Sequence, residues 1–224
     1  MMSYFSTMSF FRLVTKVRIS LYFSPAPLGE ENCRLIKQFS SAWRRTRCAV
    51  RIGRMRRPDA NEYDPNYQKY FDLIPNGDYM DMLEQNTLGT VEFFETIPST
   101  KHGYRYAEGK WTIKEVLMHI IDTERVFAYR ALAAARGDAA PMYRMDEELY
   151  AGNVDVSNRT MGDLISEFKT VRNASEFLFK NMTDEQSERF CNIVTHPMSA
   201  RAIGYFIIAH VLHHIGVLRV RYLP

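Results

Sequence analysis

The sequence predicts an all-α fold, a four-helix bundle, over most of its 224 residues. From residue 63 onward, apolar side chains recur at three- and four-residue spacing, which is the period of an amphipathic helix. Residues that start or stop helices divide this part into four long segments. The sequence contains no glycine-rich phosphate loop and no alternation of strands with helices. Four amphipathic helices bury their apolar faces by packing together as a bundle.

The expected helix boundaries follow from capping residues. The four long helices are expected at residues 78–98, 112–136, 160–182 and 199–222, after a short helix within 66–77. Asp78, Thr160 and Ser199 are preferred N-cap residues, and Gly137 is a typical helix stop. The long connection between the second and third helices is polar, with one short helix expected in DEELYA at 146–151. A connection of this length is often functional.

Composition excludes several classes of protein. The longest apolar runs, such as 202–209, are much shorter than the roughly 20 residues of a membrane-spanning helix, so no membrane segment is expected. Cys33, Cys48 and Cys191 match no zinc-finger or CxxC spacing. Neither a disulfide scaffold nor a thiolate metal site is therefore expected, and a reducing, cytoplasmic location follows.

The charge distribution divides the chain near Pro58. Residues 1–57 carry twelve lysines and arginines against two glutamates, whereas residues 58–224 carry 17 basic and 24 acidic residues. We expect a basic, poorly structured extension (1–57) and a helical domain (58–224). The extension has three interpretations: an organelle-targeting peptide, an arm that binds nucleic-acid phosphates, or an upstream segment ahead of a natural start at Met55. The third is favoured, and no nucleic-acid partner is expected, because no recognition motif accompanies the charge.

Three histidines are candidates for a metal site. His210 and His214 are four residues apart in the last helix, so both lie on one face, about one turn apart. His119 of the second helix lies among apolar residues, where a lone imidazole needs a polar partner. Three neutral imidazoles that converge inside a bundle fit a divalent ion such as zinc, nickel or iron. For each histidine taken alone, a packing role is the alternative.

Two acidic residues follow His119 in the second helix. Asp122 is about one turn away and is expected to orient an imidazole or contact bound water. Glu124, five residues from His119, is the candidate for proton transfer. Arg130 and Arg136 are candidates for binding an anionic substrate, with helix capping as the alternative for Arg136.

Three segments together resemble the DinB-like superfamily of helical-bundle metalloenzymes over about residues 63–223: HIIDTERVFAYRALAAARGD, DEELYA and SARAIGYFIIAHVLHHIGVLRVRYL. The HHxG element in the last segment is the most specific part. The resemblance implies that His119, His210 and His214 hold a divalent metal, often zinc or nickel, and that the protein forms a homodimer. It also implies either a metal-dependent hydrolase or a transferase that uses a low-molecular-weight thiol.

The sequence departs from the family pattern at two places. Many relatives have a polar or acidic residue between the paired histidines and a glutamine after HHxG, whereas Val211, Leu212 and Val217 stand here. A catalytic base at these positions is lacking, so either Asp122 or Glu124 is expected to serve, or a metal-bound hydroxide acts unaided. We expect a metal-dependent enzyme, a hydrolase or thiol S-transferase, that acts on an electrophilic small molecule. The alternatives are a non-catalytic metal- or ligand-binding stress-response protein and a nucleic-acid-associated protein.

Overall fold

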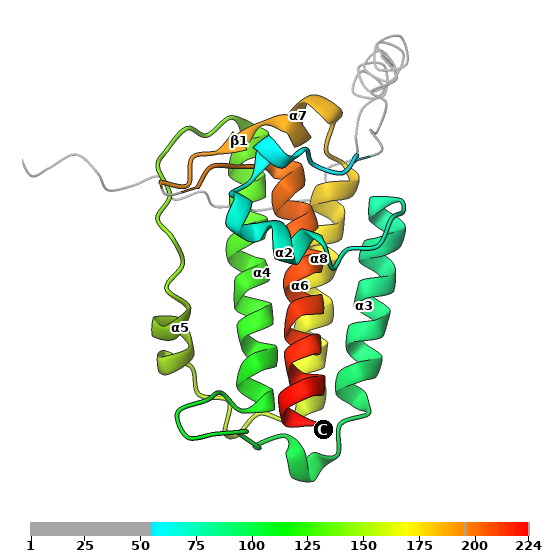
Figure 1. Cartoon of the computed structure of the whole chain (residues 1–224), viewed down its shortest axis with the longest axis vertical. Helices are drawn as coiled ribbons and strands as arrows, with labels where there is room; N and C mark the ends of the chain where they lie inside the picture. The colour runs from blue at the N-terminus through cyan, green and yellow to red at the C-terminus, as the bar shows by residue number, and fades with distance from the viewer. Residues whose placement is uncertain (1–54, 195, 224) are drawn as a thin grey trace, which may run out of the picture. The chain divides into compact units, whose positions relative to one another are not determined.

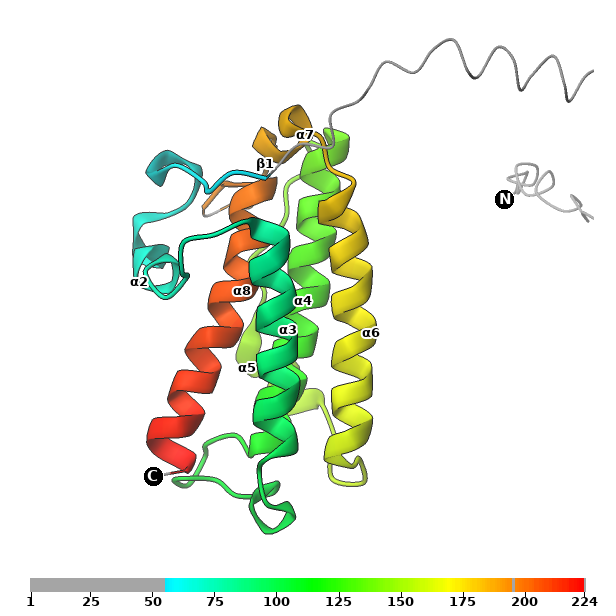
Figure 2. The ribbon, with the colours of Figure 1, turned by 90° about the vertical axis from the view of Figure 1, so that its right-hand side faces the viewer.

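A computed structural model describes residues 55–194 and 196–223, which contain four long helices. These are α3 (Tyr79–Glu95), α4 (Ile113–Arg136), α6 (Met161–Lys180) and α8 (Ala200–Val217). Helix α4 packs against α8 and α6, and α3 packs against the same two helices. Figures 1 and 2 show that α4 and α6 run in the same direction, opposite to α3 and α8. The predicted four-helix bundle is confirmed.

The parallel arrangement of α4 and α6 explains the long connection between them. The chain leaves the end of α4 and must return along the whole bundle before α6 can begin (Figure 1). On the way it forms the short helix α5 (Glu147–Asn153), which the DEELYA pattern predicts. Met142 anchors the connection, since its backbone bonds to Asn192 and Val194 at 2.8 and 3.0 Å. The connection therefore runs alongside α4.

Each long helix begins at the residue that the sequence predicts. Thr112, for example, accepts a hydrogen bond from the backbone N–H of Glu115, whose carboxylate accepts one in return. Asp78, Thr160 and Ser199 cap the other three helices through their side-chain oxygens. Gly137 ends α4 with a φ of 74°, a left-handed conformation that glycine adopts without steric cost. These signals are local, which is why the sequence reveals them.

Several small elements are not expected from the sequence. Helix α7 (Asp184–Glu188) is followed by a two-stranded antiparallel ribbon of β1 (Phe190–Cys191) and β2 (Met198–Ser199), in which Phe190 pairs with Ser199. The ribbon delivers the chain to the start of α8. The last turn after α8, Leu218–Tyr222, is π-helical. By contrast, the short helix α2 (Gln68–Phe71), which lies before α3, falls within the predicted range 66–77. Two-residue strands are too short to give a period in the sequence.

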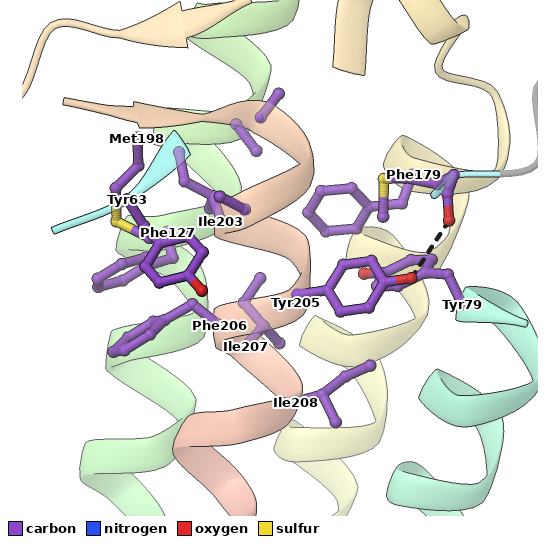
Figure 3. Packing of buried hydrophobic residues seen from close by; sticks show 14 of the residues in the cluster. Tyr63, Tyr79, Phe127, Phe179, Met198, Ile203, Tyr205, Phe206, Ile207 and Ile208 are labelled. Atoms are coloured by element: carbon purple, nitrogen blue, oxygen red, sulfur yellow. Dashed lines mark hydrogen bonds between the residues drawn. The ribbon is translucent and has the colours of Figure 1, made fainter. Parts of the chain in front are cut away.

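Helix α8 lies in the hydrophobic core. Residues 200–211 are all buried, and Figure 3 shows Phe206 directed toward Phe127 and Tyr205 toward Tyr79 and Phe179. Gly204 permits the close approach, because a Cβ there would lie 3.0 Å from both the Tyr79 hydroxyl and the Phe179 ring. The glycine therefore serves packing.

The length and composition of α8 with its π-helical end would suit a membrane span. Within the 23 residues Ala200–Tyr222, an 18-residue stretch has a mean hydropathy of 1.5, and 61% of that stretch is buried inside the bundle. Arg201, Arg219 and Arg221 interrupt the apolar residues of this segment, so the length of unbroken apolar runs does not reveal this helix. Its burial is that of a core helix.

The predicted basic extension lies outside the described residues except for residues 55–57. Met55 is buried, and its carbonyl accepts a hydrogen bond from the Tyr205 hydroxyl at 3.3 Å. Arg57 donates to the carbonyl of Phe71 at 2.6 Å. The part of the chain that packs on the bundle therefore begins no later than Met55, ahead of the boundary predicted at Pro58. The interpretations of residues 1–54 concern residues that the structure does not describe.

Candidate metal centre

The three predicted histidines meet inside the bundle. His119 comes from α4, whereas His210 and His214 come from α8. The Nε2 atom of His210 lies 3.1 Å from that of His119 and 3.0 Å from that of His214. One ring nitrogen from each residue lies within 4.8 Å of the others. The structure thus brings together imidazoles that are 91 residues apart in the chain.

Packing holds the three rings in place. His119 and His210 are buried, with 6% and 8% of their surface exposed, and His214 is partly buried. The Trp111 ring packs on His119 at 4.7 Å between centroids, and the Phe206 ring packs on His210 at 5.8 Å. His119 Nδ1 is buried without a hydrogen-bond partner among the described residues, so contacts rather than a hydrogen bond orient this ring.

Burial keeps the three imidazoles neutral at pH 7. Desolvation lowers the pKa of His119 to about 4, with a smaller contribution from His213. Burial also lowers the pKa of His210 and His214 well below the usual range, and the neighbouring histidines add to this effect. A neutral imidazole carries one N–H and one lone pair. The cluster therefore presents lone pairs, the form in which histidine binds metals.

Hydrogen bonds alone do not satisfy this cluster. His210 Nε2 faces two other Nε2 atoms, yet it can act only as one donor or one acceptor. A shared cation accommodates all three lone pairs. Two nitrogen atoms bound to one tetrahedral ion at about 2.0 to 2.1 Å lie about 3.3 Å apart, close to the observed separations. Three imidazoles without a thiolate suit zinc, nickel or iron.

A cavity of about 320 Å³ opens onto the cluster. Its wall combines the histidines with aromatic, basic and acidic side chains: Tyr67, Tyr70, Trp111, Thr123, Phe127, Arg130, Arg144, Met145, Glu147, Glu148, Phe206 and His213. A second cavity of about 210 Å³ borders His213 and His214 from the side of Trp111 and Tyr222. Glu148 lines both cavities. The proposed ligands are thus accessible to a small molecule.

The two predicted catalytic carboxylates do not line either cavity. Asp122 lies 3.2 Å from Arg125 in an ion pair, and burial raises its pKa. Glu124 is buried and accepts three hydrogen bonds from Arg172 of α6, at 2.8 to 3.0 Å. These contacts give both residues structural partners. They provide no support for the roles predicted for Asp122 in orientation and for Glu124 in proton transfer.

The carboxylates that do line the cavity are on α5. Glu147 pairs with Arg144 at 3.5 Å, whereas Glu148 has no ion pair with any described residue. The DEELYA pattern marks the segment, but the sequence assigned neither glutamate a chemical role. Their position depends on how the long connection folds back along α4, which no local pattern specifies.

The remaining arginines and histidines divide between the cavity wall and other parts of the described structure. Arg130 is buried and lines the larger cavity, whereas Arg136 is exposed in the last turn of α4. His213 packs edge-on against Tyr70 at 4.9 Å and forms part of the cavity wall. His102 Nε2 donates a hydrogen bond to the Ile97 carbonyl, and His196 pairs with Asp64. Neither His102 nor His196 reaches the cluster.

The metal-free protein is expected to lose stability on mild acidification. The pKa of His119 is about 4 in the folded chain and about 6.5 in the unfolded chain. Between these values the unfolded chain binds more protons, so the free energy of unfolding falls as pH drops from 6.5 to 4. His119 alone accounts for about 3 kcal/mol over this window.

Urea unfolding of chelator-treated protein at several pH values between 7 and 4.5 measures this loss. In His119→Gln the side chain cannot take up a proton, so the free energy of unfolding should depend less steeply on pH. Equal or greater stability at pH 4.5 than at pH 7 would contradict the burial of neutral imidazoles.

The fold and the site define a class of protein: a helical bundle that contains three histidines arranged so that they could bind a metal ion. The DinB superfamily matches residues 82–218. The chain therefore belongs to the DinB superfamily, and the resemblance noted in the sequence is confirmed.

Two solved structures are similar to this chain. YfiT from Bacillus subtilis, described as a probable metal-dependent hydrolase with an unusual four-helix bundle topology, is 17% identical with a TM-score of 0.54. The match covers 74% of this chain and 93% of YfiT. The DinB-like protein YjoA from the same organism is 22% identical with a TM-score of 0.46, covering 63% of this chain and 87% of YjoA. A search of curated proteins gave no match.

Proposed function

We propose that this protein is a metal-dependent enzyme that uses His119, His210 and His214 to hold one divalent ion, zinc or nickel. The observation that carries the proposal is the convergence of three neutral imidazoles, two of them buried and one partly buried, in the wall of a cavity. A divalent ion in such a site acts as a Lewis acid and makes a coordinated water or thiol nucleophilic near neutral pH. The description of YfiT as a probable metal-dependent hydrolase supports the same chemistry.

Other residues of the cavity are assigned to water exclusion and to proton transfer. Phe127 and Phe206, stacked with ring centroids 4.7 Å apart, form an apolar wall that limits water at the reacting group. Glu148 is our candidate for proton transfer, because it lines both cavities beside His214 and has no ion pair with the described residues. This role replaces the one predicted for Glu124, whose oxygens bind Arg172.

Two reactions fit the site: hydrolysis of an electrophilic small molecule, and transfer of a low-molecular-weight thiol to it. The second cavity beside His214 offers space for a second reactant and favours neither reaction by itself. A homodimer and a cytoplasmic location belong to the same proposal. The alternative function is a binding protein that holds a metal or ligand without turnover.

An activity screen tests the proposal. Chelator-treated protein is reloaded with Zn²⁺ or Ni²⁺ and assayed on activated esters and epoxides, with and without cysteine as the thiol. We expect turnover only in the loaded protein, and a loss of about 10²- to 10⁴-fold in Glu148→Gln. Turnover that strictly requires the thiol identifies a transferase. Turnover without a thiol identifies a hydrolase. Asp122→Asn is the control and should retain activity.

Bound metal with no turnover in any assay would favour the binding protein. Turnover in chelated protein would contradict a role for the metal.

A further inference from the structure

The bundle contains three buried arginines that differ in their partners. Arg172, fully buried, binds Glu124 through two nitrogens. Arg201, 3% exposed, pairs with Glu62 and Glu188. Arg130 is 5% exposed, yet it pairs with no carboxylate among residues 55–194 and 196–223. A buried guanidinium is normally paired, so Arg130 is the exception.

The contacts of Arg130 leave part of its guanidinium free. Nη2 donates a hydrogen bond to the Tyr143 carbonyl at 2.7 Å, and the group lies over the Phe127 ring at 4.9 Å. Nε and Nη1 have no protein partner in the described part of the chain, and neither is among the fully enclosed polar atoms. Because Arg130 lines the cavity that leads to the histidines, these donors are accessible from it.

The surroundings strengthen the attraction of Arg130 for an anion. Desolvation is the main cause that lowers its pKa, which means that burial disfavours the positive charge. An oxyanion entering the cavity relieves this cost and meets donors in the planar arrangement that binds a carboxylate. The other arginine in the wall, Arg144, is already paired with Glu147.

Arg130 and His119 line the same cavity about three helical turns apart on α4. Thr123, Phe127 and Arg130 follow His119 on one face of α4, and all of them line the cavity. Eleven residues of helix separate the Cα atoms of His119 and Arg130 by about 16 Å. The connection beside α4 follows the same path, since Tyr143 contacts Arg130 whereas Met145 contacts Thr123. A ligand that reaches both residues must be elongated.

We propose that Arg130 binds the carboxylate of an elongated substrate whose electrophilic group lies at the three histidines. This inference rests on the proposed function for the position of the reacting group, and on Arg130 itself for the anion. It assigns the substrate class, an electrophile with a carboxylate at its far end, and separates Arg130 from Arg136, which is exposed and outside the cavity.

Hydroxamates with a carboxylate tail test the two ends separately. The probes are the monohydroxamates of adipic, suberic and sebacic acids and their methyl esters, titrated calorimetrically into zinc-loaded protein. We expect the free carboxylate of the best-fitting length to bind about ten- to hundredfold more tightly than its ester. Arg130→Gln should abolish this advantage while its affinity for the ester stays within about twofold. Arg144→Gln, the matched loss of charge in the same wall, should keep the advantage.

Suberate itself, titrated into metal-free protein, provides the second arm. It should bind the unmodified protein and lose at least about tenfold in affinity in Arg130→Gln. If the hydroxamate esters do not bind but the binding of suberate depends on Arg130, the metal-based function fails and the anion site stands. If hydroxamates bind equally with acid or ester tails, the metal site stands and the role of Arg130 is overturned. Identical behaviour of Arg130→Gln and the unmodified protein in both arms also overturns it.

Discussion

His119→Ala and His214→Ala are each expected to reduce zinc affinity by more than about a hundredfold. Even the loss of a residue that only hydrogen-bonds to a metal ligand lowers metal affinity by about ten- to hundredfold. The unmodified protein, reloaded after chelation and passed over a desalting column, should retain one ion per chain. The two substitutions act on different helices but on the same nitrogen cluster. Loss of metal in both variants therefore identifies a shared site between α4 and α8.

His213→Ala is the matched control for this experiment. His213 adjoins His214 in the same helix and lines the same cavity, but it is not part of the nitrogen cluster. Its replacement should leave the metal content unchanged. Circular dichroism of each variant shows whether the bundle persists. Full zinc occupancy in folded His119→Ala or His214→Ala would remove the proposed site.

Breaking the buried pair between Glu124 and Arg172 is expected to cost about 3 to 5 kcal/mol of unfolding free energy. Both side chains are almost completely enclosed, with 2% and 0% of their surfaces exposed. Arg172→Met leaves the Glu124 carboxylate without its guanidinium, and Glu124→Gln leaves the Arg172 charge buried and uncompensated. Arg172 also donates to the Asn86 side chain of α3, so the pair connects three helices.

Urea unfolding of both single variants and of the double variant Glu124→Leu/Arg172→Met measures this effect. The double variant should lose less stability than the sum of the singles, because no charge is left unpaired. Glu167→Gln is the control, since Glu167 pairs with Arg125 and Arg159 where solvent reaches, and its loss should cost under about 1 kcal/mol. A loss below 1 kcal/mol in Glu124→Gln, with loss of activity at full stability, would instead support the catalytic role predicted from the sequence.

The angular position of residues around α4 explains why Glu124 was misplaced, but not Asp122, which lies only about 60° around the helix from His119. At about 100° per residue, Glu124 lies about 140° around the helix from His119, so it faces another neighbour. Thr123, Phe127 and Arg130 lie within about 80° of His119, and all three line the cavity. Helical spacing therefore contains the information that separates Arg130 from Glu124. Distance along the sequence alone does not.

Other features of the site have no local signature. The pairing of Glu124 with Arg172 spans 48 residues, and Glu148 reaches the histidines only because α4 and α6 are parallel and joined by a returning connection. By contrast, the N-caps of the four long helices and the His210–His214 spacing depend on residues within one turn. The sequence accordingly predicts the helices and the histidine cluster, while the remainder of the cavity requires the tertiary structure.

X-ray absorption of the zinc-loaded protein tests most directly whether His119, His210 and His214 share one ion. We expect a first shell of nitrogen and oxygen at about 2.0 to 2.1 Å, with the outer-shell scattering of imidazole rings that fits three histidines. His214→Ala should weaken that scattering or lose the ion. A shell that contains sulfur at about 2.3 Å, or no imidazole scattering at all, would contradict a metal centre built from these three residues.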